Sequence, residues 1–143
     1  TPWISAMNDQ PTVDALSEAL EDEYMARATY RKVIERFGPV RPFVNIIEAE
    51  NRHVAALLAQ FDRLGATPPA DTWPDRVQVP ETLAKACAAA VHAEIENDAL
   101  YGRLLARVSD GQASSVMRRL QEASRTRHLP AFRRCLERQQ KRA

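Results

Sequence analysis

Apolar residues recur every three to four positions in four stretches of the chain, a pattern that predicts four amphipathic helices. We expect these helices over residues 12–37, 42–64, 80–108 and 111–139. Gly38 and Gly65 fit the ends of the first two helices, because glycine readily adopts the conformations that close a helix. Pro42 and Pro80 fit first turns, where a missing N–H costs nothing. The sequence therefore predicts one all-α bundle over residues 12–140, preceded by an irregular arm over residues 1–11.

The connections between the predicted helices differ in length, and this difference predicts the topology. The first and last connections are short, so each should join an antiparallel pair of helices. Ser109 and Gln112 have the spacing of a capping box at the start of the fourth helix. Residues 66–79 carry three prolines and, at ~3.3 Å per residue, can extend to about 46 Å. We therefore expect two antiparallel hairpins joined by a long crossover loop, with the second and third helices parallel.

Each predicted helix is apolar at both ends of its buried face and polar near the middle. The polar residues in these positions are Glu23, Glu50, His53, Glu94 and His128. Unpartnered buried carboxylates are costly, and a bound cation relieves that cost. Carboxylates and imidazoles together suit iron, manganese or zinc. The alternative is that each helical face is drawn one position wrong, in which case these residues are solvated.

The two halves of the chain resemble each other in a way that includes these polar residues. At an offset of 71 positions, Glu23 and Tyr30 match Glu94 and Tyr101. At an offset of 75, His53 matches His128, but Glu50 falls opposite Arg125. We interpret the pattern as an internal duplication.

The motifs, taken in order, resemble those of rubrerythrin-like members of the ferritin-like superfamily. Glu23-Tyr24-Met25-Ala26-Arg27 resembles their first-helix motif, Glu50-x-x-His53 the second, and Glu94 with Tyr101 the third. The segment from Ser124 to Phe132 resembles the last helix of an uncharacterised bacterial and archaeal ferritin-like family. The resemblance implies a di-iron site with Glu23, Glu50, His53, Glu94 and His128 as ligands, and chemistry with oxygen or peroxide. It also implies that Tyr30 and Tyr101 donate hydrogen bonds to ligand carboxylates.

The fourth helix departs from this family pattern, because Arg125 stands where a glutamate is expected. Three carboxylates and one arginine suit one divalent ion better than two. We therefore expect the Arg125 guanidinium to fill part of the second metal position. Asp98 could restore a carboxylate, although a salt bridge from it to Arg27 or Arg125 is equally consistent with the sequence. Asn97 is a candidate neutral ligand.

Two functions compete on these observations. One is a redox metalloprotein that holds one or two iron ions, with manganese or zinc as alternatives, and that reduces peroxide or oxygen or oxidises ferrous iron. The other is a non-catalytic bundle with one metal or none that acts by protein association, for instance as a homodimer. An enzyme of the first kind would need an external electron donor, because the sequence contains no Cys-x-x-Cys module.

The two cysteines lie where helix geometry should bring them together. Cys87 precedes Glu94 by seven residues, and Cys135 follows His128 by seven. Seven residues are nearly two turns, so each cysteine shares a face with its neighbouring ligand candidate. In antiparallel helices the two displacements run in the same direction. We favour a pair of small buried thiols, with a reversible disulfide as the redox alternative.

The overall composition excludes some classes of function. The net charge is +1, so no strong field favours nucleic acid, and no apolar run approaches the ~20 residues that a membrane span needs. We expect a cytoplasmic protein that binds neither nucleic acid nor membrane. Export is the alternative, because the sequence begins at Thr1 rather than at methionine.

Overall fold

The computed structural model, which describes residues 9–142, is a four-helix bundle without strands in that range. The helices are α2 (Gln10–Phe37), α3 (Phe43–Leu64), α4 (Leu83–Leu105) and a fourth helix in three parts. Those parts are α5 (Gly111–Ala123), a π-helical turn η1 (Ser124–His128) and α6 (Leu129–Arg142). The predicted number and order of helices are confirmed. Residues 1–8 of the predicted arm lie outside the described residues, and residues 10 and 11 already belong to α2.

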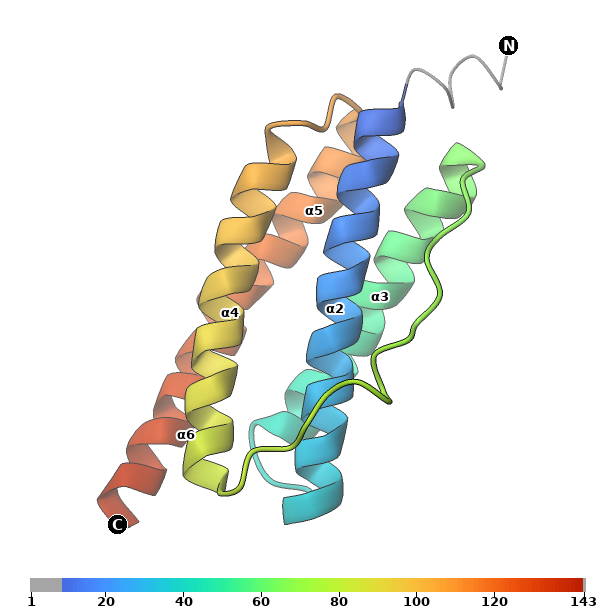
Figure 1. Ribbon diagram of the computed structural model, residues 1–143. Coiled ribbons are helices and arrows are strands. Elements are labelled where there is room, and N and C mark those ends of the chain that lie inside the picture. The colour runs from blue at the N-terminus through green and yellow to red at the C-terminus, as the bar shows by residue number, and fades with distance from the viewer. Residues whose placement is uncertain (1–8, 143) are drawn as a thin grey trace.

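The long connection between α3 and α4 runs the height of the bundle, as predicted. Figure 1 shows it crossing in front of α2, so that α3 and α4 point in the same direction. Three contacts fix it to α2: Trp73 donates its indole N–H to Glu21 at 3.3 Å, Arg27 pairs with Asp71 at 3.1 Å, and Tyr24 donates to a loop carbonyl. The crossover is therefore an ordered part of the bundle.

The third helix is shorter than predicted at both ends, and the residue that caps the fourth helix is not the predicted one. Pro80 does not open the third helix; Thr82 does, by accepting a hydrogen bond from the Lys85 backbone N–H at 3.1 Å. The same helix ends at Leu105 rather than at residue 108. The fourth helix is capped by Asp110, not by Ser109, and the Asp110 carboxylate accepts from the Ala113 N–H at 2.9 Å.

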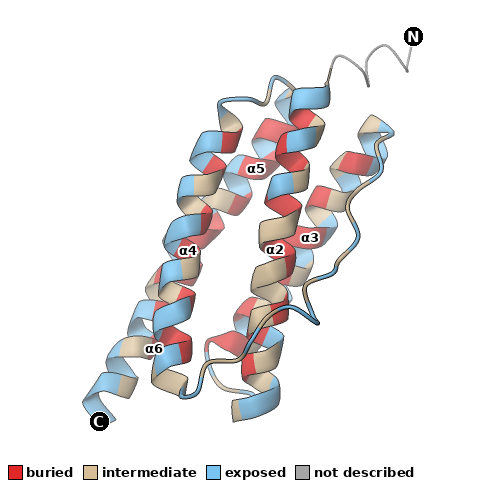
Figure 2. Ribbon diagram, viewed as in Figure 1, coloured by how far each residue is buried: buried red, intermediate tan, exposed pale blue. Residues whose placement is uncertain are grey.

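The core consists of two apolar clusters on either side of a polar layer. One cluster contains Leu16, Leu57, Phe61 and Met117, and the other contains Tyr30, Phe43 and Phe132 with Cys87 and Cys135. On α3, α4 and the fourth helix the buried glutamates and histidines fall between the residues of these two clusters in the sequence, and on α2 Glu23 directly precedes Tyr24, the last residue of the first cluster on that helix. Figure 2 shows the buried positions continuing along the inner faces of the helices. The polar layer is thus enclosed by apolar packing above and below.

Cys87 and Cys135 form a disulfide that joins α4 to α6, with a Cα–Cα distance of 5.8 Å. The predicted neighbourhood of the two cysteines is confirmed. The interpretation that they are free thiols is wrong, because the distance is well within the range that a disulfide bridges. None of the described helices is long and apolar enough to cross a membrane.

Candidate metal centre

The five glutamates and histidines singled out in the sequence are all buried and lie together in the polar layer. Their relative exposures lie between 2 and 7%. They form two groups, and within each group the potential ligand atoms all lie within 4.8 Å of one another. One group is Glu23, Glu50 and His53, and the other is Glu50, Glu94 and His128. Their role as metal ligands stays a prediction, but their convergence is a fact of the fold.

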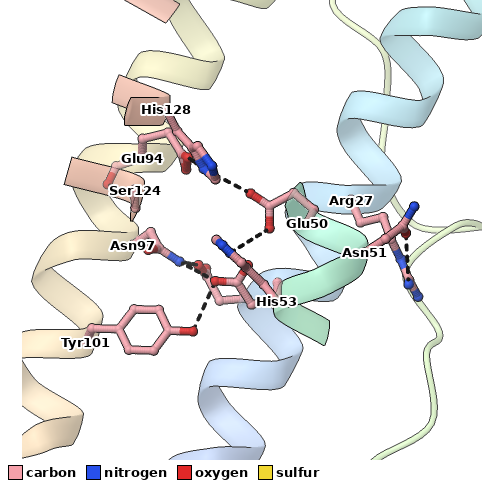
Figure 3. A network of polar contacts seen from close by, with 11 residues as sticks. Arg27, Glu50, Asn51, His53, Glu94, Asn97, Tyr101, Ser124 and His128 are labelled. Carbon is pink, nitrogen blue, oxygen red and sulfur yellow. Dashed lines mark hydrogen bonds and ion pairs between the residues drawn. The ribbon is translucent and has the colours of Figure 1, made fainter. Parts of the chain in front are cut away.

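Glu50 belongs to both groups and lies between the two histidines (Figure 3). One of its oxygens is 3.8 Å from His53 Nδ1, and the other is 3.5 Å from His128 Nδ1. Each histidine also approaches a second glutamate through Nδ1: His53 is 3.3 Å from Glu23, and His128 is 2.9 Å from Glu94. The centre is therefore two similar halves that share one carboxylate.

The charges in this layer depend on one another because the carboxylates are close and enclosed. Burial and the adjacent negative charge of Glu23 raise the pKa of Glu50 well above its ordinary range. Burial also acts to raise the pKa of Glu23, but hydrogen bonds from Glu50 and His53 outweigh it and lower that pKa to about 2. Burial raises the pKa of Glu94 despite its hydrogen bond with His128. In the polypeptide alone, Glu50 therefore keeps a proton beside an ionised Glu23.

Glu23 is held by two further donors from α4. Tyr101 donates its hydroxyl to Glu23 Oε1 at 3.0 Å, as the family resemblance implied. Asn97 donates its amide N–H to the same oxygen at 3.2 Å and to Asp22 Oδ2 at 2.6 Å. Through this amide nitrogen, Asn97 positions the carboxylate. Figure 3 shows Asn97 and Tyr101 extending from α4 towards the centre.

The matching tyrosine in the other half does not repeat this contact. The Tyr30 hydroxyl is buried and makes no hydrogen bond with any described residue. Its ring packs against Phe43 and Phe132, with centroid distances of 5.6 and 5.1 Å. The expectation that Tyr30 donates to a carboxylate is therefore wrong for this structure, because the ring belongs to the aromatic cluster.

Arg125 does not reach the centre, contrary to our expectation. It lies on the surface and pairs with Asp98 Oδ1 at 3.1 Å. The reason is the π-turn η1, in which the Leu129 N–H bonds to the Ser124 carbonyl five residues earlier. In a regular α-helix, Arg125 would lie near the face of His128, three residues on. The wider turn instead buries Ser124, and its hydroxyl contacts the Glu94 carbonyl at 3.4 Å.

Asp98 and Asp22 complete the acidic groups near the centre. Asp98 is held outward by Arg125 and by Gln121, which donates to it at 2.9 Å, so it does not supply a fourth carboxylate. Of the two salt bridges left open by the sequence, the one to Arg125 is formed. Asp22, which sequence reasoning missed, is largely enclosed, and burial raises its pKa to about 6. Its position directly before Glu23 was the available signal.

Comparison with protein-family models finds no match for this chain, and neither does a search of curated proteins. The geometry alone therefore defines the class of site: a buried carboxylate–histidine cluster in a four-helix bundle that could hold metal ions. Similar π-turns are frequent at functional sites, which agrees with the position of η1 beside His128.

Proposed function

We propose that this chain is a ferritin-like metalloprotein that holds two transition-metal ions, bridged by Glu50. The observation that carries the proposal is the membership of Glu50 in both ligand groups. Glu23 and His53 would complete one position, and Glu94 and His128 the other. In carboxylate-bridged bundles of this kind, facing helices supply glutamates and Glu-x-x-His pairs to a common centre.

The donor atoms fit such a pair of ions. Glu50 Oε2 is buried without a hydrogen-bond partner among the described residues, which is a costly state for a carboxyl oxygen. A cation at this position would satisfy it and would replace the proton that Glu50 otherwise keeps. Carboxylate oxygens with imidazole nitrogens suit iron, manganese or zinc, and the resemblance to rubrerythrin-like proteins favours iron.

The proposed activity is reduction of peroxide or oxygen, with electrons from an external donor or, in the iron-oxidising reaction, from ferrous iron itself. When bound, a pair of redox-active ions would pass these electrons to the oxidant. The polypeptide supplies the enclosure, since apolar clusters cover both sides of the layer, and Tyr101 and Asn97 fix Glu23. The non-catalytic alternative drew its support from Arg125, whose surface position removes that support.

Metal stoichiometry tests the proposal. Purified protein stripped with chelator and titrated with Fe²⁺ or Co²⁺ should take up two ions per chain. Glu50→Ala should lose both ions, whereas His53→Ala and His128→Ala should each lose one. Arg125→Ala is the matched control, because it changes a charged residue of η1 outside the centre, and it should keep two ions.

A different pattern would contradict the bridged site. Tight binding of a single ion that survives Glu50→Ala in a folded variant would place the metal elsewhere. Circular dichroism and the unfolding midpoint show whether each variant is folded. Glu50→Gln, which keeps the side-chain shape, provides a second measurement if Glu50→Ala does not fold.

A further inference from the structure

A cavity of about 560 Å³ lies between α3 and the α5–η1 stretch, on the side of the centre where the two histidines are. Its size is within the range of pockets that bind small organic molecules. The residues that line it are Asn45, Ile46, Ala49, Arg52, His53, Ala56, Val116, Arg119, Leu120, Ala123, Arg127 and His128. The proposed metal chemistry does not use this cavity.

The charged residues of the cavity are all basic. Arg52 comes from α3, Arg119 from α5 and Arg127 from η1, and no aspartate or glutamate lines the space. None of these three guanidinium groups forms an ion pair with another described residue, whereas Arg63 and Arg125 are each paired with an aspartate. Three arginines from different elements around one cavity without an acidic partner favour an anionic ligand.

Two histidines add polar ring edges to the same cavity. Both rings direct Nδ1 at the glutamates of the centre and stack with centroids 5.3 Å apart and an interplanar angle of 18°. The Nε2 edges of His53 and His128 make no hydrogen bond with any described residue. Both rings therefore line one wall of the cavity with edges that have no partner among the described residues.

The remaining walls are apolar. Ile46, Ala49 and Ala56 form the α3 side, and Val116, Leu120 and Ala123 form the α5 side. A hydrated inorganic anion gains nothing from these surfaces, whereas an aliphatic chain gains about 25 cal/mol per Å² that leaves water.

We propose that this cavity binds an organic monocarboxylate with an aliphatic body. The carboxylate lies among the arginines, and the aliphatic body lies along the α3 and α5 side chains. The site stands on the cavity alone and does not depend on bound metal. Binding beside both histidines would place such an acid next to the centre.

The test uses octanoate and its neutral analogue octanamide, titrated by calorimetry into chelator-treated protein. We expect octanoate to bind at least ten times more tightly than octanamide, and hexanoate to bind more weakly than octanoate. Arg127→Gln and Arg119→Gln should each weaken octanoate binding about tenfold, which corresponds to ~1.4 kcal/mol. Arg118→Gln is the matched control, because Arg118 is exposed on α5 like Arg119 but does not line the cavity, and it should bind octanoate normally.

Three results would overturn the proposal. Equal affinities for octanoate and octanamide would remove the role of charge, and equal effects of Arg118→Gln and Arg119→Gln would place the site elsewhere. Binding of inorganic phosphate without binding of octanoate would leave the aliphatic body without a role. Because the protein is metal-free in this test, its outcome is independent of the two-metal proposal.

Discussion

Tyr30 and Tyr101, which occupy matching positions in the two similar halves of the sequence, offer a pair of substitutions that tests the asymmetry of the centre. Tyr101 donates its hydroxyl to the buried Glu23 carboxylate at 3.0 Å, whereas the Tyr30 hydroxyl is buried without a partner among the described residues. Burial raises the pKa of both phenols well above the ordinary value, so each keeps its proton near neutral pH. Replacement by phenylalanine removes one oxygen from each site and leaves the ring packing intact.

The two substitutions should change stability in opposite directions. A hydrogen bond to a charged group contributes ~1.5–3 kcal/mol, so Tyr101→Phe should destabilise the metal-free protein by about 2 kcal/mol. A buried unpartnered hydroxyl costs ~1–3 kcal/mol, so Tyr30→Phe should stabilise it by about 1 kcal/mol. At roughly 3 °C per kcal/mol for a chain of this size, the expected Tm shifts are about −6 °C and about +3 °C.

Urea and thermal unfolding of chelator-treated protein at neutral pH measure both effects. Each variant serves as the control for the other, because the ring, the burial and the place in the repeat are matched. If Tyr30→Phe lowers the free energy of unfolding as much as Tyr101→Phe does, the Tyr30 hydroxyl has a partner, and the reasoning about an asymmetric centre fails.

Two further predictions concern the disulfide and the buried carboxyls. The disulfide closes a loop with a sequence separation of 48, for which the chain-entropy relation gives about 4 kcal/mol. A double variant with Cys87→Ala and Cys135→Ala should therefore lose about 2–4 kcal/mol of unfolding free energy, measured with urea. Denatured, unreduced protein should show no free thiol by titration. Glu50 and Asp22 have raised pKa values in the folded chain. The stability that their protonated carboxyls contribute is therefore full below pH about 4. It is lost as the pH rises through their folded-state pKa values, which for Asp22 is about 6. Chelator-treated protein should thus have a lower urea midpoint at pH 7.5 than at pH 5. Metal affinity measured by titration should rise with pH, because Glu50 must release its proton before it binds an ion. An affinity that does not change with pH would contradict the protonated Glu50.

The sequence predicted the helices and most of the centre because both depend on simple periodicity. When apolar residues recur every three to four positions, a carboxylate on the same helical face is buried together with them. Glu23, Glu50 and Glu94 follow this rule on regular α-helices. The crossover followed from loop length and proline content. These signals are local, so a single sequence contains them.

The failures occurred where the geometry was not regular or where a choice depended on three dimensions. The π-turn changes the register of the fourth helix by one residue, so the α-helical rule that placed Arg125 beside His128 does not hold there. The positions of Cys87 and Cys135 in the sequence predicted that they are neighbours, but not whether they are thiols or form a disulfide. The family resemblance implied the same role for Tyr30 and Tyr101, yet the Tyr30 ring packs against Phe43 and Phe132 and its hydroxyl makes no such contact.

The two halves of the centre are therefore similar in ligands but unequal in support. Glu23 receives hydrogen bonds from Tyr101, Asn97 and His53, which fix its carboxylate before any ion binds. Glu94 has only His128 as a hydrogen-bond donor among the described side chains. Since groups around the ligands orient them and tune metal affinity, the position at Glu23 and His53 is the better preorganised of the two. Two similar halves of the sequence thus give a centre in which Glu50 lies between a well-supported half and a less supported one, and the latter adjoins the π-turn and the arginine-lined cavity.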